Sequence, residues 1–293
     1  MKPPPFSYHD PRTVAEAVGL LGALPNARLL AGGQSLMPML NFRYLQPDHV
    51  VDLNRVEGLS YIRETADGME TGAMTRQRDL EFSALVERRF PLIHEAVRSI
   101  GHRQTRNRGT VGGSLCHLDP AAELVSCALT LDTVVVAEGP SGRREIPFAE
   151  FPLAYLTPAI AADEVVTATR FTAWPQGHGW AFEEFARRHG DFAVVSAGVL
   201  IEIDGRGRVA RAAVTLGGMG TAPVRAAALE AALTGRVPDD GLLREVCEIC
   251  RGLDALEDVH ATAAYRQHLA TVMSRRAIAK ACGRAVPMTK GLP

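Results

Sequence analysis

Two pairs of adjacent glycines are the residues of this chain best suited to chemistry. One pair lies in the run Ala31-Gly32-Gly33-Gln34-Ser35, and the other lies in the run Thr110-Val111-Gly112-Gly113-Ser114. Adjacent glycines let the backbone adopt positive φ and let a ligand approach main-chain N–H groups with no Cβ in the way. Successive N–H groups in such a turn form an anion-binding concavity. Two such turns facing each other predict a site for the two phosphates of a dinucleotide.

The composition describes an ordinary globular chain. Its 293 residues suffice for two or three modest domains, and 46% are hydrophobic while 22% are charged. The 32 basic residues balance the 33 acidic ones, so we expect neither nucleic acid nor an anionic membrane as a partner. No apolar run is long enough for a membrane span, and no apolar run follows Lys2 as a signal peptide would require. Five sparsely placed cysteines fit a reducing cytoplasm, where we expect the protein to be located.

Hydrophobic spacing and turn residues divide the chain into three predicted domains. A small α/β domain, residues 1–55, has a helix over 14–24 and strands over 28–30 and 50–53. The middle domain, 56–175, has a hairpin at Asp67-Gly68, helices over 76–85, 91–100 and 119–129, a polar loop over 101–109, and strands of a mostly antiparallel sheet over 133–136, 143–148 and 165–171. The last domain, 176–293, has a three-stranded antiparallel sheet (181–186, 193–203, 209–216) and a helical layer (223–233, 242–253, 262–282). The predicted fold class is α+β.

Two short motifs that can suggest cofactor or metal sites have simpler interpretations here. The run Gly205 to Ala210 matches G-x-G-x-x-A, but a strand pattern follows it instead of the helix that a dinucleotide fold requires. We therefore interpret it as a hairpin turn. Cys247 and Cys250 have C-x-x-C spacing but lie within an apolar helical pattern, which favours core cysteines over zinc ligands.

Ser114 comes directly after the second glycine pair, and Asp119 follows it five residues later. The Asp119 carboxylate can accept a hydrogen bond from a ribose or ribityl hydroxyl, and it can equally cap a helix that begins at Pro120. Ser114 lies outside a G-x-S-x-G elbow, so we expect no serine hydrolase chemistry. The chain offers no metal site and no evident catalytic acid or base.

The two glycine runs, extended to Arg106–Leu115, together with Asp119-Pro120, closely resemble the flavin subunit of the molybdenum hydroxylases. That group includes the bacterial carbon monoxide dehydrogenases, quinoline oxidoreductase and the xanthine dehydrogenases. The likeness continues in order along the chain, through 187–193, 217–225, 264–266 and 275–277. It therefore covers nearly the whole sequence.

The resemblance implies a two-part FAD-binding fold of the PCMH type followed by the C-terminal domain. FAD would bind with its pyrophosphate on Ala31 to Ser35 and on Thr110 to Ser114, mostly through backbone N–H groups, and with its sugar portion near Asp119. Relatives often have tyrosine against the isoalloxazine ring where this chain has Phe192. A partner subunit would hold a molybdenum–pterin cofactor and another would hold two [2Fe–2S] clusters, in a dimer of heterotrimers. This chain would pass the electrons to an external acceptor.

Two other interpretations stay open at this stage. The chain can be a freestanding flavin oxidoreductase with the same binding fold. Alternatively, it can be a nucleotide-binding or scaffolding module with no catalytic role.

Overall fold

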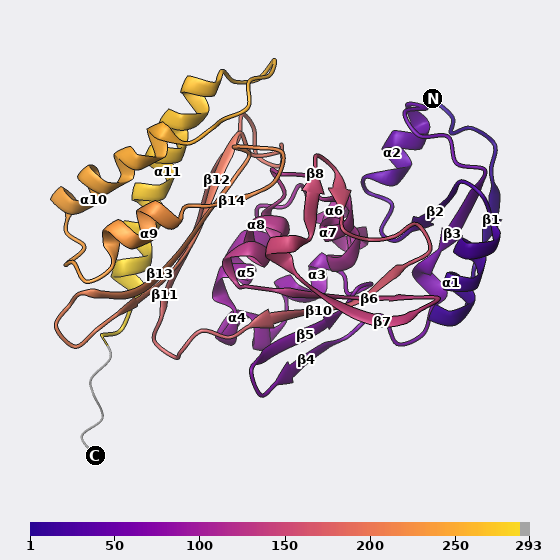
Figure 1. The fold of residues 1–293 in the computed structure, drawn as a ribbon, viewed down its shortest axis with the longest axis horizontal. Helices are drawn as coiled ribbons and strands as arrows, with labels where there is room; N and C mark the ends of the chain where they lie inside the picture. The colour runs from indigo at the N-terminus through magenta and orange to yellow at the C-terminus, as the bar shows by residue number, and fades with distance from the viewer. Residues whose placement is uncertain (288–293) are drawn as a thin grey trace. The chain divides into compact units, whose positions relative to one another are not determined.

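A computed structural model describes residues 1–287, and the last six positions of the predicted third domain, 288–293, lie outside the described residues. The chain forms two compact units, each built from separate stretches (Figure 1). The first unit contains residues 1–82, 102–118 and 133–172. The second contains 83–101, 119–132 and the chain from Ala173 onward. No helix among the described residues is long and apolar enough to cross a membrane.

The first unit begins with a small parallel sheet of strand order β1-β3-β2. Its strands are β1 (Ser7–His9), β2 (Ala27–Leu30) and β3 (His49–Asp52). Parallel neighbours need a crossover connection, and α1 (Val14–Ala23) and α2 (Leu36–Asn41) lie in the two connections. Thr13 caps α1 by accepting a hydrogen bond from the Glu16 N–H, 3.1 Å away.

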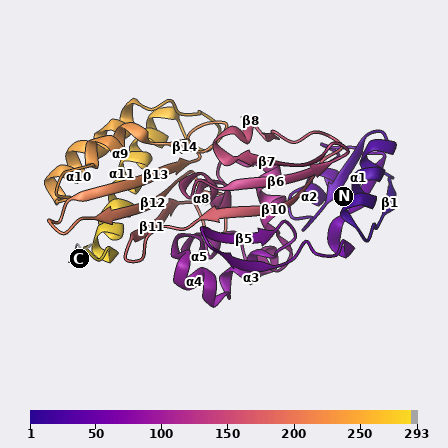
Figure 2. The ribbon, with the colours of Figure 1, turned by 60° about the horizontal axis from the view of Figure 1, so that its bottom comes forward.

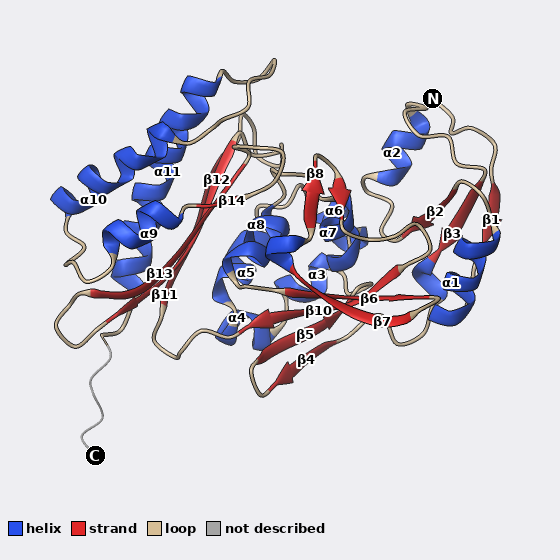
Figure 3. Cartoon of the chain, in the orientation of Figure 1, coloured by secondary structure: helices blue, strands red, loops and turns tan. Residues whose placement is uncertain are grey.

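A five-stranded sheet forms the rest of the first unit, and each neighbouring pair in it is antiparallel (Figure 3). Its order is β4 (Ile62–Thr65), β5 (Gly68–Gly72), β10 (Val165–Thr172), β6 (Val134–Gly139) and β7 (Gly142–Pro147). Helix α7 (Val111–His117) packs on β5 and β10, while α3 (Gln77–Glu81) packs on α6 (Arg103–Arg108). A short hairpin of β8 (Pro152–Ala154) and β9 (Thr157–Pro158) also contacts α7.

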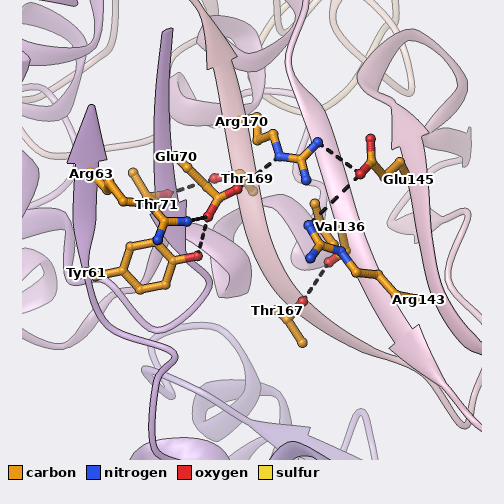
Figure 4. Close-up of polar contacts among 10 residues, drawn as sticks. All are labelled: Tyr61, Arg63, Glu70, Thr71, Val136, Arg143, Glu145, Thr167, Thr169 and Arg170. Atoms are coloured by element: carbon orange, nitrogen blue, oxygen red, sulfur yellow. Dashed lines mark hydrogen bonds and ion pairs between the residues drawn. The ribbon is translucent and has the colours of Figure 1, made fainter. Parts of the chain in front are cut away.

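One face of the five-stranded sheet carries a row of paired charges (Figure 4). The Glu70 carboxylate accepts hydrogen bonds from the Tyr61 hydroxyl at 2.7 Å, from Arg63 at 2.6 Å and from Arg170 at 2.9 Å. Arg170 also pairs with Glu145 at 2.9 Å. Burial, followed by the hydrogen bond to Glu70, raises the pKa of Tyr61 to about 12, which keeps the phenol protonated as a donor. These contacts link the three neighbouring strands β4, β5 and β10, and the pair of Arg170 with Glu145 reaches across β6 to β7.

The second unit is a four-stranded antiparallel sheet with helices on both faces (Figure 2). Its strands are β11 (Gly179–Phe185), β12 (Val195–Ile203), β13 (Val209–Gly217) and β14 (Val224–Arg225), and its helices are α4 (Ala84–Arg89), α5 (Pro91–Val97), α8 (Glu123–Thr130), α9 (Ala227–Leu233), α10 (Asp240–Cys247) and α11 (Ala263–Arg284). Alternate apolar residues of β12 join α9, α10 and α11 in one core cluster. On the other face, the backbone of Gly198 lies against Thr130 of α8. Every residue of β12 is therefore buried.

The α+β fold class is confirmed, and the structure corrects four local predictions. The expected loop over 101–109 contains α6, and the helix expected over 76–85 divides into α3 and α4. Helix α8 starts at Glu123 instead of Asp119. The third predicted sheet has four strands, because β14 forms where a continuous helix was expected from Pro223. The boundaries drawn at residues 55 and 175 stay a prediction.

Candidate functional site

The first glycine segment is a bend between β2 and α2 whose N–H groups point to no protein acceptor. The backbone N–H groups of Gly32, Gly33, Gln34 and Ser35 have no hydrogen-bond acceptor within residues 1–287. Gly33 has a φ of +74°, a conformation that a side chain disfavours. Four successive donors without a partner are what an anion-binding turn requires, so the anion site predicted for this segment stays a prediction.

The second glycine segment has a different geometry from the one predicted. Gly112 and Gly113 lie in the first turn of α7, which Thr110 caps. Their N–H groups donate to the Ala73 carbonyl oxygen at 2.8 Å and to the Thr110 hydroxyl oxygen at 3.1 Å. The N–H groups of Val111 and Ser114 donate to the carbonyl oxygens of Thr75 and Thr110. The prediction that this second segment also has unpaired N–H groups is therefore wrong, because the N–H groups of residues 111–114 all donate within the protein.

The two glycine segments nevertheless lie against each other, as the sequence predicts. A Cβ added to Gly32 would be 2.2 Å from the Arg108 carbonyl oxygen. A Cβ added to Gly113 would be 3.3 Å from the Ala31 Cβ, and one on Gly112 would be 2.6 Å from the Ala73 Cβ. Glycine at these positions allows backbone to approach backbone. We call the two segments together, residues 31–35 and 110–114, the glycine cradle.

A polar bridge that sequence analysis did not find joins the two sides of the glycine cradle. The Arg76 guanidinium donates to the Arg108 carbonyl oxygen at 2.5 Å and to the Asn54 Oδ1 at 2.6 Å. The Asn54 amide donates to the Ala31 carbonyl oxygen at 3.0 Å, and also to Asp52. Asn54 lies two residues after the C-terminal end of β3. A search for polar residues just after predicted strands would have found it.

Two predicted site residues belong to the second unit. The Asp119 Oδ1 accepts from the Ala121 N–H at 2.9 Å, and its Oδ2 has no protein partner within the described chain. Asp119 therefore shapes a turn before α8 and is not the N-cap, a position that Ala122 occupies. Phe192 has 68% of its surface exposed, in a loop that the Arg188–Asp191 ion pair closes at 3.1 Å.

The remaining motifs have the structural roles that were expected. The turn at Gly205 to Gly207 joins β12 to β13 as a hairpin, with Asp204 accepting from the Arg206 and Arg208 N–H groups. Cys247 and Cys250 are fully buried in the core beneath α11. Burial raises the pKa of Cys247 to about 12, so it is a neutral thiol. Within residues 1–287, no group of three or more His, Cys, Asp or Glu side chains could hold a metal ion.

Comparison with protein families identifies this kind of fold. Residues 4–174 match the family described as the FAD-binding domain in molybdopterin dehydrogenase, and residues 180–281 match the CO dehydrogenase flavoprotein C-terminal domain. The class of protein is thus an FAD-binding subunit of a molybdopterin-dependent oxidoreductase. The chain belongs to the medium-subunit family of the molybdenum hydroxylases.

Relatives are similar over their full length. The 6-hydroxypseudooxynicotine dehydrogenase complex subunit alpha of Paenarthrobacter nicotinovorans is 38% identical, over 100% of this chain and 99% of the relative. The carbon monoxide dehydrogenase medium chain of Hydrogenophaga pseudoflava is 35% identical, over 97% of this chain and 99% of the relative. The solved carbon monoxide dehydrogenase of that organism matches with a TM-score of 0.94 at 37% identity, covering 98% of this chain and 100% of that one. The solved quinoline 2-oxidoreductase of Pseudomonas putida 86 matches with a TM-score of 0.92 at 32% identity, covering 97% of this chain and 99% of that one.

The residues of the glycine cradle fit the diphosphate of FAD. Four N–H groups without a partner in the described chain supply hydrogen-bond donors for an anion. Such donors stabilise negative charge without a lysine. FAD is the cofactor of this chain, and a solved protein to which it is similar is described as a Cu,Mo-CO dehydrogenase.

Proposed function

We propose that this chain is the electron-transfer subunit of a molybdenum hydroxylase, accepting electrons from [2Fe–2S] clusters of one partner and delivering them to an external acceptor. The observation that carries the proposal is the run of four unpaired N–H groups at residues 32–35, joined to the second glycine segment. Bound FAD supplies the exchange of one or two electrons, and the protein supplies its binding and orientation.

Each predicted site residue has a role in this proposal. Residues 31–35 donate N–H groups to the diphosphate, and Thr110 to Ser114 form the packed opposite wall that keeps the donors in place. The free Oδ2 of Asp119 accepts from a hydroxyl of the sugar portion. The exposed Phe192 ring would stack on the flat aromatic isoalloxazine. These roles need no catalytic acid or base in this chain.

The proposed partners are a large molybdopterin-binding subunit and a small iron–sulfur subunit, in a cytoplasmic dimer of heterotrimers. The names of the relatives support this, since one is called a subunit of a dehydrogenase complex and others are called medium chains. The terminal acceptor is oxygen, a quinone or another oxidant that accepts electrons at this subunit.

Purification from the native host under mild conditions tests the proposal. We expect two further polypeptides to co-purify with the chain, together with molybdenum, iron and one FAD per copy of the chain, and mass spectrometry of the native complex would identify them. Substrate of the complex should reduce the flavin only when all three polypeptides are present.

Two results would contradict the proposal. A lone polypeptide that reduces its own flavin from a small donor would indicate a freestanding oxidoreductase. A purified chain that is colourless and gains no flavin on addition of FAD would indicate a nucleotide-binding or scaffolding module.

A further inference from the structure

The bridge of Asn54 and Arg76 ends on two carbonyl oxygens at the contact between Gly32 and the stretch before the second glycine segment. Asn54 donates to the carbonyl oxygen of Ala31, the residue before the first glycine pair. Arg76 donates to the carbonyl oxygen of Arg108, the backbone atom nearest to a Cβ on Gly32. Arg76 and Asn54 are themselves joined at 2.6 Å. One continuous chain of hydrogen bonds therefore runs from Ala31 in the first segment to Arg108, two residues before the second segment.

The bond to Ala31 determines where a donor of the anion site points. A trans peptide is planar, and its C=O and N–H point in opposite directions. Because Asn54 holds the Ala31 carbonyl, the N–H of the same peptide, that of Gly32, is directed away from Asn54. Loss of this hydrogen bond would free the Ala31–Gly32 peptide to rotate, and the Gly32 N–H would lose its fixed direction.

The hydrogen bonds of the Arg76 guanidinium go to neutral oxygens, although the carboxylates of Asp79 and Asp52 are nearby charges. The Arg76 side chain is partly buried, and no carboxylate oxygen of the described chain lies within 4.0 Å of it. Burial and the nearby Arg108 charge lower the pKa of Arg76, and the charges of Asp79 and Asp52 oppose this shift. The backbone beside Arg76 is tied to the residue before the second glycine segment, because the Gln77 N–H donates to the Gly109 carbonyl oxygen at 2.9 Å. A cation held next to the glycine cradle on neutral acceptors suits a site whose ligand is an anion.

We propose that Arg76, acting through Asn54, is a positioning residue that preforms the FAD site by fixing the Ala31–Gly32 peptide against the second glycine segment. This inference depends on the proposed binding of FAD. It assigns to two polar residues, Asn54 and Arg76, a share of the affinity for FAD.

Rebinding of FAD to the flavin-free full-length chain, followed by quenching of flavin fluorescence, tests the role of Arg76. We expect Arg76→Gln to raise the dissociation constant for FAD by about tenfold or more. Arg78→Gln is the matched control, because Arg78 is an exposed arginine of α3 whose amide contact is with Asn107 at 3.2 Å. Arg76→Lys keeps the charge but loses the fork of donors, so it should fall between wild type and Arg76→Gln.

A second variant separates positioning from a general loss of folding. Asn54→Ala removes the bonds to Ala31 and to Arg76 while the Arg76 guanidinium is kept. Its effect on FAD affinity should not add to that of Arg76→Gln, because both variants break one chain of hydrogen bonds. The visible circular dichroism of bound flavin should change in both variants. Unaltered FAD affinity in Arg76→Gln, or fully additive effects, would overturn the inference. A wild-type chain that binds no FAD would instead overturn the proposed function.

Discussion

Replacement of Gly32 by alanine tests how closely the two glycine segments must approach. The added Cβ would lie 2.2 Å from the Arg108 carbonyl oxygen and 2.9 Å from the Gly109 Cα. Favourable contacts between heavy atoms need about 3.5 Å, so one segment must move by about 1 Å. Gly32 does not have a positive φ, so this collision and not backbone strain is the cause of the effect.

The free-energy cost of this displacement can be estimated and compared with the measured loss of FAD affinity. A shift of this size breaks or lengthens the bond from Arg76 to Arg108 and the bond from Asn54 to Ala31, each contributing about 0.5–1.5 kcal/mol. The sum, about 1–3 kcal/mol, corresponds to a loss of FAD affinity of about 5- to 150-fold. Equilibrium titration of the flavin-free chain with FAD measures it directly.

A matched glycine in the same unit provides the control for this measurement. Gly19 lies on the exposed side of α1, and a Cβ there would meet nothing within 4 Å. Gly19→Ala should leave FAD affinity unchanged and raise the free energy of unfolding by about 0.5–1 kcal/mol. Equal FAD affinity in Gly32→Ala, Gly19→Ala and the wild type would refute the packing argument.

Three further predictions concern other parts of the chain. Phe192→Tyr should keep the FAD content of the purified protein while changing the rate of flavin reoxidation in stopped-flow experiments; loss of the cofactor would show that Phe192 does not lie against the ring. The Arg106 hydrogen bond lowers the pKa of Glu81, so this pair should stabilise the fold above the unfolded-state value near pH 4.5 and lose that contribution as pH falls through the folded-state pKa. Glu81→Gln should then reduce the free energy of unfolding by about 1–3 kcal/mol at neutral pH but little at pH 3, as chemical denaturation at both pH values would show. Cys247 and Cys250, buried as neutral thiols, should not react with a thiol reagent until the protein is unfolded; rapid labelling of either one in the native protein would contradict their burial.

Local patterns predicted much of the fold because they depend on nearby residues. The apolar alternation of β12 and β13 and the turn at Gly205 to Gly207 are local, and both formed as expected. The stretch 103–108 misled the prediction, because a polar helix without an apolar face has no periodic signal. Arg106 of α6 pairs with Glu81 of α3 at 2.8 Å, a tertiary contact that stabilises the helix.

In the glycine cradle, some features follow from the amino-acid sequence alone and others only from the tertiary structure. Which residues lack a Cβ, and hence which two segments can approach each other, follows from the amino acids alone. Tertiary structure decided which N–H groups remain for a ligand. The segment after β5 places the carbonyl oxygens of Thr75 and Ala73 against the N–H groups of Val111 and Gly112, while no acceptor of the described chain pairs with the N–H groups of residues 32–35. Tertiary structure also brought Asn54 and Arg76 together. Hydrogen-bond partners distant in sequence meet only when the sheets assemble, so no local pattern records them.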